Sequence, residues 1–316
     1  MKKKLRMKGN VIGTLLITCL LFTSANLSAQ IFAPEGLNMP GEYDGFNNPP
    51  TVNAIAGVQK TNGEVLPNDD LETGIYSTQI EVASSGGDLT GGTYEWLFTS
   101  GSSGSEFNNK WAGTTVTMNT VQNYTYNTGS NNNITITDGK WYTMNWRDQG
   151  YVNTNGIFME TSSAPITISN VSVPSGNIGP GSSATITATT NSAPSNEKLY
   201  LIYSIDNFNS NFQVIDITNA SGTSHSGTIS NLSSNTEYNY YVITTTVSIN
   251  DNNNQEYYDM RTIDIDDDAG NHYKFNVDAT WTTSGNSNSW SNSSAWDAGE
   301  VPVNNQPVTI QDNLIL

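Results

Sequence analysis

The stretch KWYTMNW, residues 140–146, shows the pattern that decides the fold class. Its large side chains Tyr142, Met144 and Trp146 fall at every second position, and a β-strand places such residues on one face. Trp141 falls on the opposite face, which makes it a candidate for exposure to solvent. Short alternating runs of this kind recur between turns rich in Gly, Asn, Asp and Pro, and helical periodicity is nearly absent. The sequence therefore predicts an all-β protein.

These runs predict two consecutive antiparallel β-sandwiches of the immunoglobulin-like class. We expect the first sandwich in residues 31–165 and the second in residues 166–277, because a small-residue stretch ending at Pro165 separates two groups of runs. Residues 278–316 are too few to bury a core, so we expect them to be the opening of an incomplete β-rich module. The supporting runs are 76–82, 94–98, 116–118, 134–136 and 142–146 in the first sandwich, and 184–188, 199–205, 214–217, 226–229, 238–242 and 273–277 in the second.

Residues 1–30 predict a secretory signal peptide. They hold five basic residues and no acid, and an apolar run from Val11 to Phe22 is too short to span a membrane comfortably. Ser28-Ala29-Gln30 then offers a cleavage site. We expect a secreted or cell-surface protein with no membrane insertion after signal cleavage. The alternative is an uncleaved membrane anchor.

Composition excludes several function classes. The chain has a formal net charge of −17, and without residues 1–30 it keeps seven basic and 29 acidic side chains, a net charge of −22. Such a surface cannot form the basic stripe of a nucleic-acid binder. The two histidines, His225 and His272, lie far apart in sequence, and the only cysteine, Cys19, falls in the signal segment. We find no catalytic signature and expect that the protein is not an enzyme.

An acidic stretch near the end of the second sandwich is a candidate cation site. Asp264, Asp266 and Asp268 alternate and are followed by Gly270. Carboxylates on one face of a strand would suit a structural Ca²⁺. The alternative is a solvated acidic hairpin turn without a cofactor.

Three motifs in the first sandwich form an ordered series. GEYDGFN spans residues 41–47, GTYEWLFTSG spans 92–101 and leads to Asn109-Lys110-Trp111, and GSNNNITI spans 129–136. The series resembles the starch- and glycogen-binding modules, including the glycogen-binding domain of AMP-activated kinase. It is also similar to sandwich domains of the outer-membrane starch-binding proteins of Bacteroidota.

The resemblance implies a polysaccharide-binding surface. The family's first stacking Trp falls on Phe46, its loop Trp on Trp111 and its hydrogen-bonding Asn near Asn132, whereas its strand Lys has no counterpart here. An aromatic ring can bury the apolar face of a pyranose, and an amide can both donate to and accept from its hydroxyls. The alternatives are that Trp111 anchors a loop and that the asparagines serve turns.

The second sandwich resembles fibronectin type III domains. The stretch SGTISNLSSNTEY, residues 226–238, carries Leu232, Thr236 and Tyr238 at the spacing of the family's L-x-x-x-T-x-Y corner. The resemblance implies that the Tyr hydroxyl bonds to the upstream backbone. Such domains are mostly spacers or binding platforms.

The sequence predicts non-catalytic binding of a starch- or glycogen-like polysaccharide by an exported multidomain protein, through Phe46, Trp111, Asn132 and Trp141. The alternative is an extracellular structural or adhesion scaffold within a larger surface protein, with further domains after residue 316 and with every aromatic residue structural.

Overall fold

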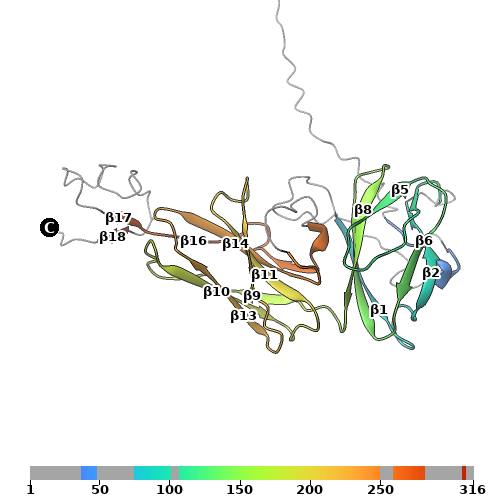
Figure 1. Cartoon of the computed structure of the whole chain (residues 1–316), viewed down its shortest axis with the longest axis horizontal. Helices are drawn as coiled ribbons and strands as arrows, with labels where there is room; N and C mark the ends of the chain where they lie inside the picture. Colours follow the sequence, from blue (N-terminus) through green and yellow to red (C-terminus); the bar gives the residue numbers. More distant parts are fainter. Residues whose placement is uncertain (1–36, 48–74, 101–106, 250–258, 282–307, 311–316) are drawn as a thin grey trace, which may run out of the picture.

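The computed structural model describes residues 37–47, 75–100, 107–249, 259–281 and 308–310. Two antiparallel β-sandwiches follow one another along the long axis of the molecule (Figure 1). This confirms the predicted all-β, immunoglobulin-like fold class. The predicted signal peptide, residues 1–30, and most of the C-terminal segment lie outside the described residues.

The first sandwich consists of a six-stranded sheet in the order β1-β7-β8-β5-β4-β3, faced by the β2-β6 pair. A short 3₁₀-helix, η1 (Glu42–Asp44), lies beside β2. The strands of the first sandwich are β1 (Ile75–Val82), β2 (Gly92–Trp96), β3 (Phe98–Thr99), β4 (Lys110–Ala112), β5 (Gln122–Tyr126), β6 (Asn132–Ile136), β7 (Lys140–Arg147) and β8 (Thr154–Thr161).

The alternating residues of this sandwich form its core. Tyr142, Met144 and Trp146 on β7 are all buried, as the period of two predicts. Two predicted runs differ in detail. The run 94–98 is divided at Leu97 between β2 and β3, which belong to different sheets, and residues 116–118 form no strand although Val116 packs against the core.

The second sandwich pairs a sheet in the order β13-β10-β9 with a sheet in the order β12-β11-β14-β15, in which β16 also pairs with β14. Its strands are β9 (Ile168–Val171), β10 (Ser183–Thr190), β11 (Lys198–Ser204), β12 (Gln213–Asp216), β13 (Ser224–Ser230), β14 (Glu237–Thr245), β15 (Asp264–Asp266) and β16 (Tyr273–Asn276). A 3₁₀-helix, η3 (Asp259–Arg261), precedes β15.

The predicted tyrosine corner is present in the second sandwich. The backbone N–H of Ser233 donates a hydrogen bond of 3.0 Å to the Tyr238 hydroxyl oxygen. Leu232 is buried in the core beneath it, and the Thr236 hydroxyl donates to the Ser234 carbonyl. This bond fixes the turn from β13 to β14, which is the role that the fibronectin-like pattern implies.

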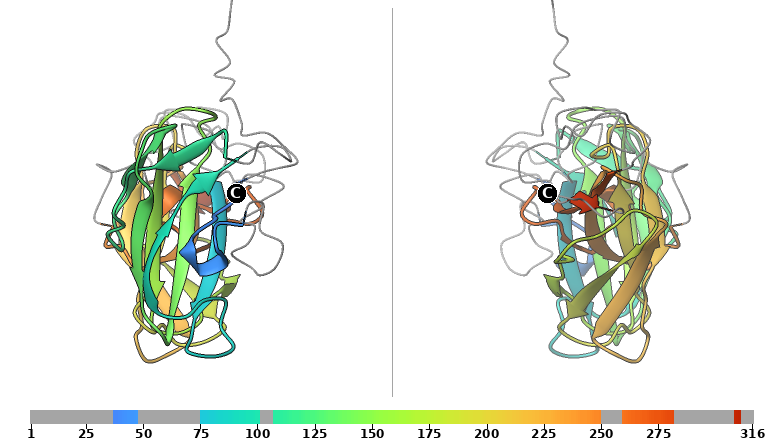
Figure 2. Two further views of the ribbon diagram at one scale, coloured as in Figure 1. Left: turned by 90° about the vertical axis from the view of Figure 1, so that its right-hand side faces the viewer. Right: turned by 90° about the vertical axis from the view of Figure 1, so that its left-hand side faces the viewer.

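Beyond the second sandwich, β17 (Ala279–Trp281) pairs in parallel with β18 (Val308–Ile310). This pair lies at the end of the molecule opposite η1, as the two end views show (Figure 2). Across the described ranges, no helix has both the length and the apolar character needed to traverse a bilayer.

Candidate functional site

Trp111 is part of the core, and the prediction that it forms an exposed stacking platform is wrong. It lies on β4, opposite Phe98 and Tyr126, and is fully buried. Its indole Nε1 donates a hydrogen bond of 2.6 Å to the Val152 carbonyl, and its ring centroid lies 5.1 Å from that of Trp146. The sequence placed Trp111 in a loop because β4 is too short to show alternation.

The side-chain amide of Asn132 also forms its hydrogen bonds within the protein. It begins β6, is fully buried, and donates through Nδ2 to the Trp111 carbonyl at 3.0 Å. Its Oδ1 accepts the backbone N–H of Thr114 at 3.0 Å. Because both ends of the amide serve the first sandwich, the predicted hydrogen bond to a sugar is not available in this structure.

The other two predicted residues remain partly accessible but lie on different surfaces. Phe46 follows η1 in a left-handed turn with φ 58°, and its N–H donates to the Gly41 carbonyl. The helix η1 is at the end of the molecule away from the second sandwich (Figure 2). Trp141 lies on the outer face of β7, between Glu81 and Thr161, on the sheet that faces the second sandwich. The four predicted residues therefore do not form one binding strip.

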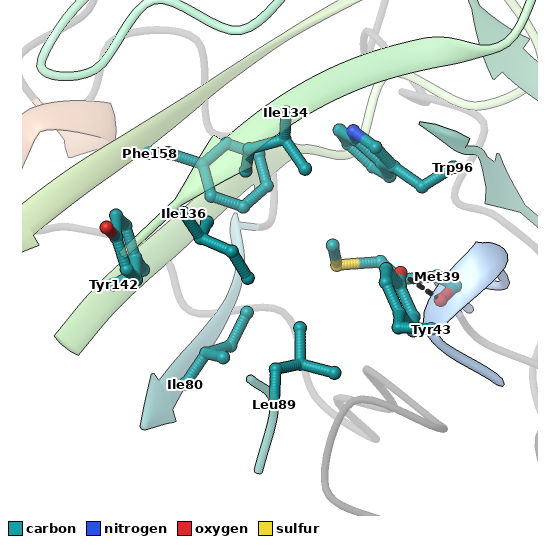
Figure 3. A pocket seen from close by; sticks show the side chains of 9 residues that line it. All are labelled: Met39, Tyr43, Ile80, Leu89, Trp96, Ile134, Ile136, Tyr142 and Phe158. Atoms are coloured by element: carbon teal, nitrogen blue, oxygen red, sulfur yellow. Dashed lines mark hydrogen bonds between the residues drawn. The ribbon is translucent and has the colours of Figure 1, made fainter. Parts of the chain in front are cut away.

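An apolar cavity of about 20 Å³ lies between the two sheets of the first sandwich (Figure 3). Tyr43 closes one side, and its hydroxyl donates to the Met39 carbonyl at 2.6 Å. Burial, with the nearby charge of Asp44, raises the pKa of Tyr43, so its hydroxyl stays protonated. This volume is close to that of a single water and is too small for a sugar. The lining side chains are Met39, Tyr43, Ile80, Leu89, Trp96, Ile134, Ile136, Tyr142 and Phe158.

The three aspartates of the predicted cation site have separate roles. Asp264 accepts the backbone N–H of Ile168 at 2.6 Å, and Asp266 accepts the Tyr273 hydroxyl at 2.8 Å. Asp268 lies in the exposed turn that follows, with φ 57°. Within the described ranges, no three His, Cys, Asp or Glu side chains are grouped as a metal ion would require. The carboxylates of Asp264 and Asp266 therefore serve different local contacts and Asp268 is exposed, and calcium binding stays a prediction.

Both histidines are buried in the second sandwich and contact neighbouring residues of that domain. His225 is fully buried, and its Nδ1 accepts the backbone N–H of Asn219 at 3.0 Å. The ring of His272 packs against Phe208 and Tyr241. Burial lowers the pKa of both imidazoles, so both rings are neutral at physiological pH.

The outer face of β7 carries a contact between the two sandwiches that sequence reasoning missed. Asn145 donates through Nδ2 to the carbonyl of Met260 at 2.9 Å and to that of Thr262 at 2.7 Å. Asn145 is almost completely buried. One amide side chain of the first sandwich thus satisfies two backbone acceptors around η3 of the second.

An apolar cluster surrounds these hydrogen bonds. Met260 of η3 is fully buried against Ile75, Ile157 and Met159 of the first sandwich. Partly buried side chains from both domains close the cluster: Val121, Val247 and Ile263. We call these residues, together with Asn145, the interdomain joint.

Further hydrogen bonds extend the contact along β8. Asn196 of the second sandwich donates to the Glu160 carbonyl and accepts the Ser162 N–H, each at 2.9 Å. The Thr246 hydroxyl donates to the side-chain oxygen of Asn119. The outer face of the first sandwich is therefore held at several points. In the sequence, the polar residues of this face look like those of an ordinary solvent-exposed face. No sequence pattern therefore predicts the joint.

No protein-family model and no curated protein matches this chain. Among solved structures, the crystal structure of chicken CNTN1 FN1-FN3 domains gives a weak match. The sequence identity is 14%, the match covers 50% of this chain and 73% of that chain, and the TM-score is 0.21.

Proposed function

We propose that this chain is a non-catalytic extracellular scaffold or adhesion module in which two immunoglobulin-like sandwiches act as one rigid arm. The observation that supports this most strongly is the interdomain joint. Asn145 bonds to two carbonyls across the joint, and Met260 is buried against the first sandwich.

The joint differs from the usual contact between consecutive domains. Such contacts are commonly polar and allow relative motion of the domains. Here a buried apolar cluster is combined with two buried hydrogen bonds from the Asn145 amide to backbone carbonyls of the second sandwich. Separating the domains would expose Met260 and Met159 to water and leave Asn145 without its carbonyl acceptors. A fixed angle between domains is useful to a protein that holds another module at a set distance.

The extracellular location is part of the proposal and rests on residues 1–30. Their basic start, apolar run and small residues are typical of an exported protein. The low content of basic residues after this segment suits a surface that does not bind nucleic acid or anionic lipid.

The scaffold function is preferred to polysaccharide binding by the first sandwich. Trp111 and Asn132, the two residues with the most specific implied contacts, are buried and hydrogen-bonded within the protein. Phe46 and Trp141 lie on separate surfaces, so they cannot stack on neighbouring rings of one glycan.

Pulsed electron–electron double resonance on the full chain measures the distance between spin labels in the two sandwiches, and so tests whether they form a rigid arm. Cys19→Ser removes the only cysteine, and Asn123→Cys and Ser226→Cys place labels at exposed strand positions in the two sandwiches. We expect one narrow distance distribution, and a broader one when Asn145→Ala is added. A broad distribution in the chain that retains Asn145 would contradict the proposal.

A further inference from the structure

A groove of about 290 Å³ lies at one end of the second sandwich. It is between β12 and β13, which are edge strands of different sheets. The residues that matter for its chemistry are Tyr203, Phe212, Gln213, Ile229, Asn231 and Tyr238. This groove is distinct from the first sandwich, where the sequence placed a ligand, and from the interdomain joint.

The groove begins where the two edge strands stop touching. At Gly227 on β13, an added Cβ would lie 2.6 Å from Ile217 and 3.3 Å from Ile215, so the backbone approaches the β12 side closely. Farther along β13, the chain turns away at Asn231, which has φ 56°. The gap between Gln213 and Asn231 is therefore built into the backbone of the domain.

Two tyrosine rings form the aromatic wall of the groove. Tyr203 on β11 and Tyr238 on β14 have ring centroids 6.2 Å apart. The Tyr238 ring is held by the hydrogen bond from Ser233. Tyr203 is half-buried, and no described residue is hydrogen-bonded to its hydroxyl. Burial raises the pKa of Tyr203, which keeps this hydroxyl a neutral donor.

The mouth of the groove presents two side-chain amides, one from the first residue of β12 and one from the residue that follows β13. Gln213 and Asn231 are exposed and line opposite sides. Asp206 accepts the Ser204 hydroxyl at 2.5 Å and the Ser210 N–H at 3.0 Å, which anchors the loop that leads to Phe212. A binding site whose loop is already ordered loses less conformational entropy when a ligand binds.

The residues that line the groove carry no charged side chain, although the chain as a whole has a net charge of −17. A charged ligand would lose its hydration there without gaining an ion pair, which is costly. The lining instead offers aromatic surface, hydroxyls and amides. These groups together suit a neutral ligand that has one apolar face and several hydroxyls.

We propose that this groove binds one sugar ring of an uncharged glycan. The C–H face of a pyranose packs against Tyr203, and its hydroxyls bond to the Tyr203 hydroxyl and to the amides of Gln213 and Asn231. The groove is at the lower end of the size range of ligand pockets, so it holds a single ring. This site is independent of the scaffold function and would add a contact with surface carbohydrate.

Titration of the full chain with single sugars, followed by amide chemical shifts in NMR, tests the site. The probes are glucose, galactose, mannose and N-acetylglucosamine, with glucuronic acid as the charged comparison. We expect at least one neutral sugar to shift the amides of Tyr203, Gln213 and Asn231 in a saturable way. Glucuronic acid should leave them unchanged.

Two variants and one control make the test specific. Gln213→Ala and Tyr203→Phe each remove one hydrogen-bonding group and should weaken binding by roughly 3- to 10-fold. Gln79→Ala, at an exposed position of β1, should leave the affinity unchanged. The proposal is overturned if no neutral sugar shifts these amides or if the shifts persist unaltered in both groove variants. It is also overturned if the groove responds only to an extended peptide that pairs with β12.

Discussion

The side-chain amide of Asn145 donates a hydrogen bond of 2.9 Å to the backbone carbonyl of Met260, a residue 115 positions further along the chain. The side chain of Met260 is itself fully buried in the apolar cluster between the sandwiches. The same residue thus contributes a polar and an apolar contact to the interdomain joint. At Asn145, therefore, the polar outer face of β7 is buried rather than solvated.

Asn145→Ala should loosen the joint. The substitution removes two hydrogen bonds across the joint, to the carbonyls of Met260 and Thr262, and each such bond contributes about 0.5–1.5 kcal/mol. We expect a larger radius of gyration in small-angle X-ray scattering, together with a lower midpoint of urea unfolding. Asn123→Ala, at an exposed position of β5, is the matched control and should change neither quantity. Equal effects of the two substitutions would show that Asn145 has no special role.

Met260→Ala should weaken the same joint through packing. Truncation of a fully buried methionine removes apolar contacts and leaves a cavity beside Ile157 and Met159, at a cost of about 2–5 kcal/mol. We expect unfolding of the full chain to separate into two transitions by calorimetry, because the domains no longer stabilise each other. A single transition at the unchanged temperature would argue against this packing role.

Trp111→Ala should destabilise the first sandwich and not merely remove a ligand contact. The ring is fully buried and hydrogen-bonded to the Val152 carbonyl, so its loss should cost about 3–5 kcal/mol. Equilibrium urea unfolding measures this directly. Phe107→Ala removes an exposed aromatic residue and should cost less than about 0.5 kcal/mol. A stably folded Trp111→Ala protein would restore the interpretation of Trp111 as a surface platform.

Stability should fall as the pH decreases below about 6.5, because both histidines are buried in the folded state with a lowered pKa. In the unfolded chain each imidazole binds a proton near its ordinary pKa of 6.5, whereas the folded state resists protonation. The unfolded state therefore binds more protons below that pH, and acid favours it.

Urea unfolding at about pH 7.5 and about pH 5.5 measures this dependence. We expect a lower midpoint at the lower pH, and a smaller difference in His272→Gln. A midpoint that stays level or rises on acidification would contradict the burial of these rings.

The fold class could be predicted because alternation reports which residues face a core. Tyr142, Met144 and Trp146 were assigned correctly from spacing alone, and the spacing of Leu232, Thr236 and Tyr238 indicated the corner that the structure contains. Both patterns are local, so a single sequence reveals them.

The candidate sites could not be predicted because they depend on contacts between distant segments. Trp111 looks like a loop residue until β3 and β5 lie on either side of it. Asn145 looks solvent-exposed until η3 covers it, and Gln213 becomes a groove residue only when β13 lies opposite. The alternation of polar residues on a strand is the same whether water or another domain covers that face.

Residual dipolar couplings of backbone amides in the full chain measure the relative orientation of the sandwiches most directly. If the joint fixes one domain on the other, couplings from β7 and β8 and those from β11 and β14 will fit one alignment tensor with the orientation seen in the structure. Two tensors of different magnitude would mean that the domains move independently, and the rigid-arm function would have to be abandoned.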